Sequence, residues 1–157
     1  MENKKEQVHR HRDLDAEVGW NLYRTGMLMR REGVRQLAEF NVTPEQWQVL
    51  MILINKGGLS QKAIGDITLQ DAPTISRVLQ RLLKKKLIKK KTDVRDKRAF
   101  CLEITGAGKD LMEKMMKKLK KNRTEYNITD SQKRELIKLL KGLRENLEVI
   151  HSKGGTE

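Results

Sequence analysis

A 34-residue stretch in the middle of the chain, residues 71–104, changes its apolar period from that of a helix to that of strands. In its first half, apolar residues recur at helical spacing, at Ile75, Val78, Leu79, Leu82 and Leu83. They form one buried face of an amphipathic helix. The chain then reads as two strands, 87–92 and 98–104, around a polar turn, with Phe100, Leu102 and Ile104 on one face of the second. An amphipathic helix followed by a charged hairpin is therefore predicted.

Two further helix starts precede this stretch. Thr43 to Gln46 places a threonine cap, a proline in the first turn and a glutamine three residues after the cap. Gly57 and Gly58 are expected to end that helix. Ser60 is expected to cap a short helix, and Asp71 the next one. A short helix, a tight turn, a second helix and a hairpin form a winged helix-turn-helix, which is predicted over residues 41–105.

Long helical regions are predicted on both sides of this module, over residues 13–40 and 106–152. Asp13 is expected to cap the first region and Thr105 the second, in which Thr129 to Gln132 forms a capping box for a last helix. Their apolar stripes are too long for the winged module to cover, so we expect a second copy of the chain to cover them. The predicted fold class is mainly α (α+β), with long N- and C-terminal dimerisation helices and a flexible arm over residues 1–12.

Positive charge is concentrated in two segments. Residues 71–98 hold eleven Lys or Arg and three Asp, a net charge of +8 out of +13 for the whole chain. Residues 109–123 carry a net charge of +5. Such a concentration repels itself and favours a polyanion as partner, for which double-stranded DNA is the expected choice. A lysine-rich face that only interacts with water is the simpler alternative.

Composition argues against several other classes of protein. Cys101 is the single cysteine, so no internal disulfide can form and a reducing, cytoplasmic location is expected. No apolar run approaches the length of a membrane span. No Gly-rich phosphate loop or plausible Ser/His/Asp grouping occurs, so an enzyme is not expected. His9, His11 and His151 lack a metal-binding spacing, and no metal or cofactor is predicted.

The polar face of the predicted helix at 71–86 offers side chains that suit base edges. Projected at about 100° per residue, the face opposite the apolar set carries Pro73, Thr74, Arg77, Gln80, Arg81 and Lys84. Arginine can bond guanine in two places, glutamine can bond adenine, and the threonine methyl can contact a thymine methyl. The lysines at 84–86 and 89–91, including the hairpin residues Lys90 and Lys91, are expected near phosphates. The hairpin tip carries Arg95, Lys97 and Arg98, and an arginine there can enter a narrow minor groove.

Several segments resemble the multiple-antibiotic-resistance-regulator (MarR) family of bacterial transcription regulators. They are Leu59–Gln61, Thr74–Arg77, Leu87–Ile88, Asp93–Arg98 and Leu102–Gly108. The resemblance implies a homodimer that binds a palindromic operator as a sequence-specific repressor and is released by a small aromatic or phenolic ligand. It also implies that Thr74, Ser76 and Arg77 lie in the major groove and that Arg95 is the wing-tip arginine.

One position departs from the family pattern. Members usually have glycine just before the first strand, whereas this chain has Lys86. Either Lys86 adopts a left-handed backbone conformation at some cost, or the helix ends differently. The methionines leave a similar choice, because Met27, Met29, Met51, Met112, Met115 and Met116 either line a deformable ligand pocket or simply fill the core.

Three alternative functions remain open from the sequence. The lysine runs alone would suffice for a non-specific architectural DNA-binding protein. A basic winged-helix module can also bind an acidic protein partner. Cys101 could act as an oxidant sensor, although only nearby lysines favour a reactive thiolate there.

Overall fold

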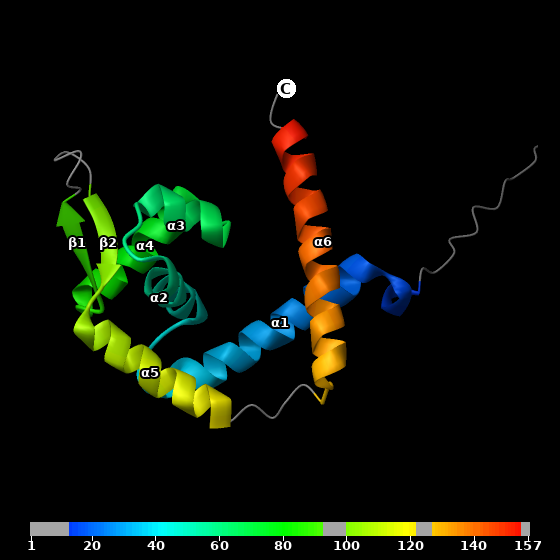
Figure 1. Cartoon of the computed structure of the whole chain (residues 1–157), viewed down its shortest axis with the longest axis horizontal. Coiled ribbons are helices and arrows are strands. Elements are labelled where there is room, and N and C mark those ends of the chain that lie inside the picture. The colour runs from blue at the N-terminus through cyan, green and yellow to red at the C-terminus, as the bar shows by residue number, and fades with distance from the viewer. Residues whose placement is uncertain (1–12, 93–99, 122–126, 155–157) are drawn as a thin grey trace, which may run out of the picture. The chain divides into compact units, whose positions relative to one another are not determined.

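The computed structural model describes residues 13–92, 100–121 and 127–154, without the side chains of 121 and 151–154. The chain divides into two units, residues 1–117 and 118–157. Its elements, in chain order (Figure 1), are η1 (Leu14–Ala16), α1 (Val18–Leu37), η2 (Ala38–Phe40), α2 (Pro44–Lys56), α3 (Gln61–Thr68), α4 (Ala72–Lys84), β1 (Ile88–Thr92), β2 (Phe100–Ile104), α5 (Gly106–Lys121) and α6 (Asp130–Gly154). This is the predicted mainly α architecture with one small sheet. The arm predicted over residues 1–12 lies outside the described residues.

The first long helix begins later than predicted. The Asp13 carboxylate accepts a hydrogen bond from the Asp15 backbone N–H at 3.1 Å, but it caps the 3₁₀ turn η1 rather than α1. Glu17 then has an extended backbone, so α1 starts at Val18. After η2, Asn41 adopts a left-handed conformation with φ 53°. The predicted helix over 13–40 is therefore three pieces, because a capping aspartate can open a short 3₁₀ turn as well as a long helix.

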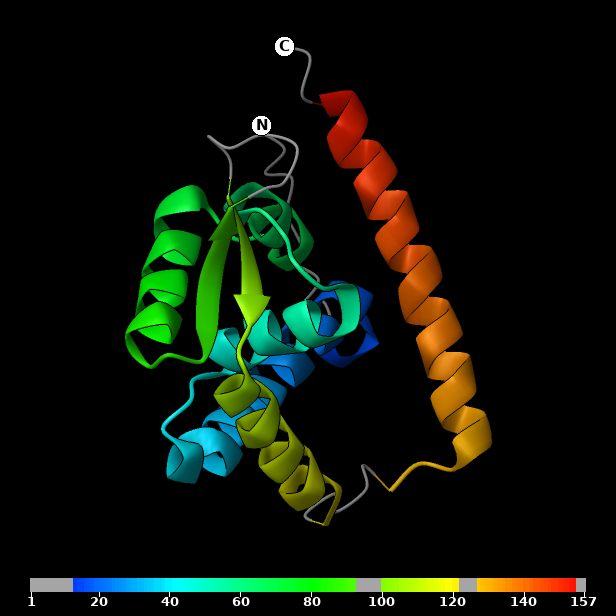
Figure 2. The ribbon, with the colours of Figure 1, turned by 60° about the vertical axis from the view of Figure 1, so that its left-hand side comes forward.

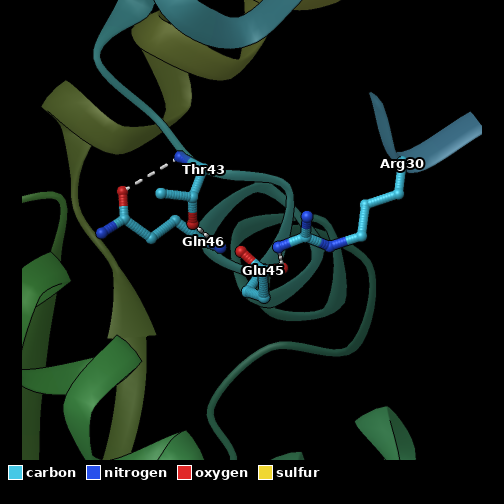
Figure 3. Close-up of polar contacts among 4 residues, drawn as sticks. All are labelled: Arg30, Thr43, Glu45 and Gln46. Carbon is cyan, nitrogen blue, oxygen red and sulfur yellow. Dashed lines mark hydrogen bonds and ion pairs between the residues drawn. The ribbon is translucent and has the colours of Figure 1, made fainter. Parts of the chain in front are cut away.

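Both ends of α2 lie where the sequence predicts them. Thr43 Oγ1 accepts from the Gln46 backbone N–H, and Gln46 Oε1 accepts from the Thr43 backbone N–H, each at 3.3 Å (Figure 3). Pro44 occupies the first turn, where a missing N–H costs no hydrogen bond. Gly57 ends the helix with φ 79°, a value that favours glycine.

Side-chain caps also start α3 and α4, as predicted. Ser60 Oγ accepts from the Ala63 backbone N–H at 3.1 Å, and the Asp71 carboxylate accepts from the Thr74 backbone N–H at 2.7 Å. Between the two helices, Leu69 takes a left-handed conformation with φ 55° and permits a tight turn. The result is a helix-turn-helix whose second helix starts at a defined residue.

The hairpin follows α4 directly, and Figure 2 shows α4 beside it. Its antiparallel strands pair Ile88 with Ile104 and Thr92 with Phe100. Strand β1 begins one residue later than predicted, and the tip, residues 93–99, lies outside the described residues. An isolated bridge between Leu59 and Leu102 joins the segment before α3 to β2. The hairpin is thus hydrogen-bonded to the helical part of its module.

The junction between α4 and β1 resolves the question about Lys86. Its φ is 58°, so it occupies the left-handed region. Its N–H donates to the Leu83 carbonyl at 2.9 Å, and the Leu87 N–H donates to the Leu82 carbonyl at 3.1 Å. These two bonds form a Schellman motif, which requires a left-handed residue at this position. Lys86 therefore stands where glycine would be less strained.

The core of the first unit draws side chains from α2, α3, α4, β2 and α5. The largest fully buried residues are Val49, Leu50, Leu53, Ile64, Ile75, Leu82, Leu102, Met112 and Met115. Met112 and Met115 therefore fill the core, whereas Met27, Met29 and Met116 are about half exposed. Because nine buried side chains from five elements share one core, α4 and the hairpin are parts of one packed module.

The start of α5 is held against the α4–β1 junction. The Thr105 hydroxyl accepts from the Gly108 backbone N–H at 3.1 Å and donates to the Lys86 carbonyl at 2.8 Å. A Cβ on Gly108 would collide with the Leu87 carbonyl and the Ile104 side chain. Only glycine therefore lets α5 begin this close to β1.

Helix α6 in the second unit begins at the predicted capping box. The Thr129 N–H donates to Gln132 Oε1 at 2.8 Å, and the Gln132 N–H donates to Thr129 Oγ1 at 3.2 Å. Its apolar side chains are exposed, at Leu136, Ile137, Leu139, Leu140, Leu147, Val149 and Ile150. Helix α1 exposes a similar set, at Val18, Leu22, Tyr23, Met27, Leu28 and Val34. Within the described ranges, none of the helices has both the length and the apolar character needed to cross a bilayer.

Candidate nucleic-acid interface

Helix α4 separates its side chains into a buried face and an exposed face. Ile75, Val78, Leu79 and Leu82 are buried, as the periodicity predicts. The opposite face carries exposed residues, most of them three or four positions apart, at Pro73, Arg77, Gln80, Arg81 and Lys84. This face therefore offers a row of hydrogen-bond donors and positive charges on one rigid helix.

Two further predicted DNA contacts are less accessible: Thr74, which was expected on this face, and Ser76, which the resemblance places in the major groove. Both are half-buried, and the Thr74 backbone N–H is already bonded to the Asp71 cap. That backbone hydrogen bond is the main reason why the pKa of Asp71 lies below its ordinary value. A carboxylate charge is therefore fixed at the start of α4, beside side chains expected to meet DNA.

The hairpin lysines are exposed but have partners within the chain. Lys90 Nζ lies 4.4 Å from the centre of the Phe100 ring, within the range of a cation–π contact. Lys91 Nζ donates to Glu103 Oε1 at 3.0 Å, and Lys89 Nζ lies 3.7 Å from Glu103 Oε2. The predicted tip residues Arg95, Lys97 and Arg98 lie outside the described residues.

Sequence reasoning missed Glu103. The hydrogen bond from Lys91 is the main reason why the pKa of Glu103 lies below its ordinary value, and the same bond raises the pKa of Lys91. The strand register could have revealed this contact, because it pairs Lys89 with Glu103 and Lys91 with Cys101. One carboxylate thus reduces the positive charge that the hairpin presents.

The three lysines from 84 to 86, all predicted near phosphates, differ in exposure. Lys84 and Lys86 are exposed, but Lys85 is half-buried. Its Nζ donates to Gln46 Oε1 at 3.1 Å and to the Asn41 carbonyl. Burial, followed by the charge of Arg81, lowers the pKa of Lys85. Its ammonium points toward the start of α2 from the residue that immediately follows α4.

Other candidate sites gain little from the structure. Cys101 is half-buried on β2, and its Sγ lies 3.0 Å from where a Cβ on Gly58 would stand. An oxidant-sensing role for it stays a prediction. Among the described residues, no three His, Cys, Asp or Glu are grouped so that they could hold a metal ion. His9 and His11 lie outside the described residues, and the side chain of His151 is not described.

Part of the sequence matches a known protein family. The model of the MarR family matches residues 40–99, from the end of η2 to the residue before β2. A protein of Thauera aromatica, whose name proposes that it regulates transcription of the hcr operon, is 28% identical over 136 residues. The match covers 85% of this chain and 82% of that protein.

Solved structures share the fold. A probable transcriptional regulator from Pseudomonas aeruginosa has a TM-score of 0.73 and 27% identity, over 83% of this chain and 98% of its own. MepR of S. aureus, solved in complex with DNA, has a TM-score of 0.73 and 22% identity, over 85% of this chain and 98% of its own. These comparisons confirm the predicted fold class and the prediction of a non-enzymatic regulator. Residues 40–99 thus match the MarR family, and the chain as a whole is similar to winged-helix transcription regulators.

Proposed function

We propose that this protein is a sequence-specific repressor, which binds a palindromic DNA operator as a homodimer and releases it when a small aromatic or phenolic ligand binds. One observation carries the DNA-binding part above all others. The face of α4 that turns away from the core carries Pro73, Arg77, Gln80, Arg81 and Lys84, all exposed. An exposed helix of this composition fits the major groove, which is wide enough to admit it.

The residues divide by the kind of contact that their chemistry favours. Arg77 and Gln80 suit base edges, with Thr74 and Ser76 contributing from the half-buried edge of the same helix. Arg81 and Lys84 suit phosphates, as do Lys90 and Lys91 on the hairpin. We assign the wing-tip contacts to Arg95, Lys97 and Arg98. The DNA complex of MepR and the structure of CouR with a 23-mer duplex support DNA as the partner.

The exposed apolar faces support a homodimer. Residues 13–40 and 106–152 are the proposed dimerisation region, and α1 and α6 within it expose large apolar side chains. Apolar side chains repeated along a helix tend to be covered by another chain. Two modules related by a twofold axis would bind two half-sites about one helical turn apart, which gives an operator its palindromic form.

Release by a ligand is proposed from two proteins that share the fold. CouR of Rhodococcus jostii RHA1 was solved with p-coumaroyl-CoA, and BpsR of Bordetella bronchiseptica is regulated by 6-hydroxynicotinic acid. Both compounds contain an aromatic ring. We place the encounter with such a ligand in the cytoplasm, because a chain with a single cysteine can form no internal disulfide and suits a reducing compartment.

Selection of bound duplexes from a random DNA pool tests the function and the symmetry together. The expected result is a palindrome with half-sites about ten base pairs apart, bound by two copies in sedimentation analysis. If the protein binds selected and random duplexes with nearly equal affinity, the result would instead support the alternative function of a non-specific architectural DNA-binding protein. Failure to bind any duplex at about 50 mM salt would contradict DNA binding and support the protein-interaction module.

A further inference from the structure

The three consecutive lysines at the end of α4 have different surroundings. Lys84 and Lys86 are exposed, whereas Lys85 is half-buried. The Lys85 ammonium donates to two acceptors that lie about forty residues earlier in the chain, the Gln46 side-chain oxygen at 3.1 Å and the Asn41 backbone carbonyl. The residue that caps the end of α4 is thus hydrogen-bonded to the start of α2.

The acceptor at the centre of this contact is itself firmly held. Gln46 is 2% exposed, and it is the buried polar side chain in the core of the described residues. Its Oε1 also accepts from the Thr43 backbone N–H at 3.3 Å in the capping box that starts α2 (Figure 3). The position of the Lys85 ammonium is therefore defined by an atom that the α2 cap already fixes.

This arrangement has an energetic cost that its hydrogen bonds offset. Burial and the charge of Arg81 lower the pKa of Lys85, so its ammonium is less favourable here than in water. Hydrogen bonds from a charged donor are stronger than neutral ones. An ammonium that is satisfied inside the module is a poor candidate for a phosphate contact, which would require both bonds to break.

The contact adds directional restraint to the end of α4. The buried residues Leu79 and Leu82 hold the inner face of α4 by apolar contact, which is not directional. A hydrogen bond has a preferred distance and angle. The Lys85 bonds therefore fix the rotation of the last turn, which also carries the exposed Arg81 and Lys84.

We propose that Lys85 is a positioning residue for the DNA interface: by its bonds to Gln46 and Asn41 it orients the last turn of α4, and it makes no phosphate contact itself. This proposal rests on the proposed DNA-binding function. The proposal gives Lys85 a different role from its neighbours Lys84 and Lys86, although the sequence alone does not distinguish the three lysines.

The test measures the affinity for a selected duplex as a function of salt for the wild type and three variants. Lys85→Met removes the donor together with a charge, Gln46→Met removes the acceptor and keeps the charge, and the third variant combines both. We expect each single variant to bind about fivefold more weakly. The double variant should bind no more weakly than either, and the slope of log Kd against log salt should stay unchanged.

The matched control is Lys84→Met, which removes the neighbouring exposed charge. As a phosphate contact, it should reduce the slope by about 0.9. Thermal unfolding of each variant, followed by circular dichroism, identifies a temperature at which all are folded. Lys85→Met keeps the test valid even if Gln46→Met does not fold.

Two results would overturn the positioning role. If Lys85→Met reduces the slope as Lys84→Met does, while Gln46→Met leaves the affinity unchanged or raises it, Lys85 binds phosphate. If both variants only lower the melting temperature, and the folded proteins bind as tightly as the wild type, the contact stabilises the fold and orients nothing. Failure of the wild type to prefer any selected duplex would instead overturn the proposed function, and the positioning role with it.

Discussion

The Lys91 ammonium and the Glu103 carboxylate are hydrogen-bonded at 3.0 Å diagonally across the hairpin, because the register pairs Lys91 with Cys101. The same carboxylate lies 3.7 Å from Lys89. One negative charge therefore attracts two lysines of the proposed wing. A phosphate at either lysine would compete with Glu103 for the same ammonium.

Removing that competitor should strengthen DNA binding. We expect Glu103→Gln to tighten binding to any duplex, regardless of sequence, and to make the salt dependence steeper by up to about one unit of slope. Fluorescence anisotropy at several salt concentrations measures both. Glu113→Gln is the matched control, because Glu113 forms an exposed ion pair with Lys117 on α5 at 2.7 Å. Equal effects of the two variants would show that only net charge matters.

If Arg77 contacts base edges directly, replacing it should reduce the DNA-binding affinity by an amount that depends on the DNA sequence. Arg77→Ala should weaken binding to the selected operator by about 1–3 kcal/mol and relax the preference at one base position. Lys90→Ala should weaken binding evenly across sequences and reduce the salt slope by about one. Competition between operator and random duplexes measures the difference. The assignment of Arg77 fails if both variants lose the same affinity on both duplexes.

The left-handed backbone of Lys86 predicts an inverted order of stability. At an ordinary helix position, a protein with glycine is less stable than the same protein with alanine by about 1 kcal/mol. At φ 58° the order should reverse, because alanine keeps the strain that glycine relieves. Both Lys86→Gly and Lys86→Ala remove the same charge, so the comparison isolates the backbone. Urea unfolding of the two variants measures it, and a more stable alanine variant would contradict this account of the junction.

The ion pair between Arg30 and Glu45 predicts a dependence on pH. Arg30 Nη2 lies 2.9 Å from Glu45 Oε1 and joins α1 to α2 (Figure 3). Burial opposes the charge on Glu45, but its own backbone N–H, Thr43 and Arg30 together hold its pKa below the ordinary value. A carboxyl group with a lowered folded-state pKa stabilises the protein above the unfolded-state pKa. That stabilisation is lost as the pH falls through the folded-state pKa.

Glu45→Gln should therefore be less stable than the wild type at neutral pH, by less than about 1 kcal/mol for a partly exposed pair. The difference should persist above the ordinary pKa of a glutamate, about 4.3, and shrink as the pH falls below it through the lowered folded-state pKa. Urea unfolding across this range measures it, and Arg30→Gln should reproduce part of the loss. A difference that does not change with pH would show that the carboxylate charge contributes nothing.

Local patterns predicted most of the winged module. The apolar stripe of α4 lies on the buried face as expected, and Thr43, Ser60, Asp71 and Thr129 cap the predicted helices. These features depend on residues within one or two turns of each other, so a short window of sequence contains the necessary information. The caps also explain why the start of α4, and hence its exposed face, could be assigned before the structure.

The parts that sequence could not predict depend on distant partners. Lys85 turns inward because of Gln46 and Asn41, and nothing near Lys85 in the sequence distinguishes it from its neighbours. Glu103 faces Lys91 only once the register of the hairpin is known. Both cases need a spatial fact that no local period contains. The start of the first helix is the exception, because Asp13 bonds to Asp15 only two residues away and the same side-chain cap serves a 3₁₀ turn and an α-helix.

The glycine at the start of α5 has a consequence for how this protein can be altered. The Leu87 carbonyl occupies the place of a Cβ on Gly108, with the Ile104 side chain beside it. A single methyl group there would act as a wedge between α5 and the first strand, and it would change no charge. Gly108→Ala would thus shift the wing relative to α5 without changing the charge of the protein.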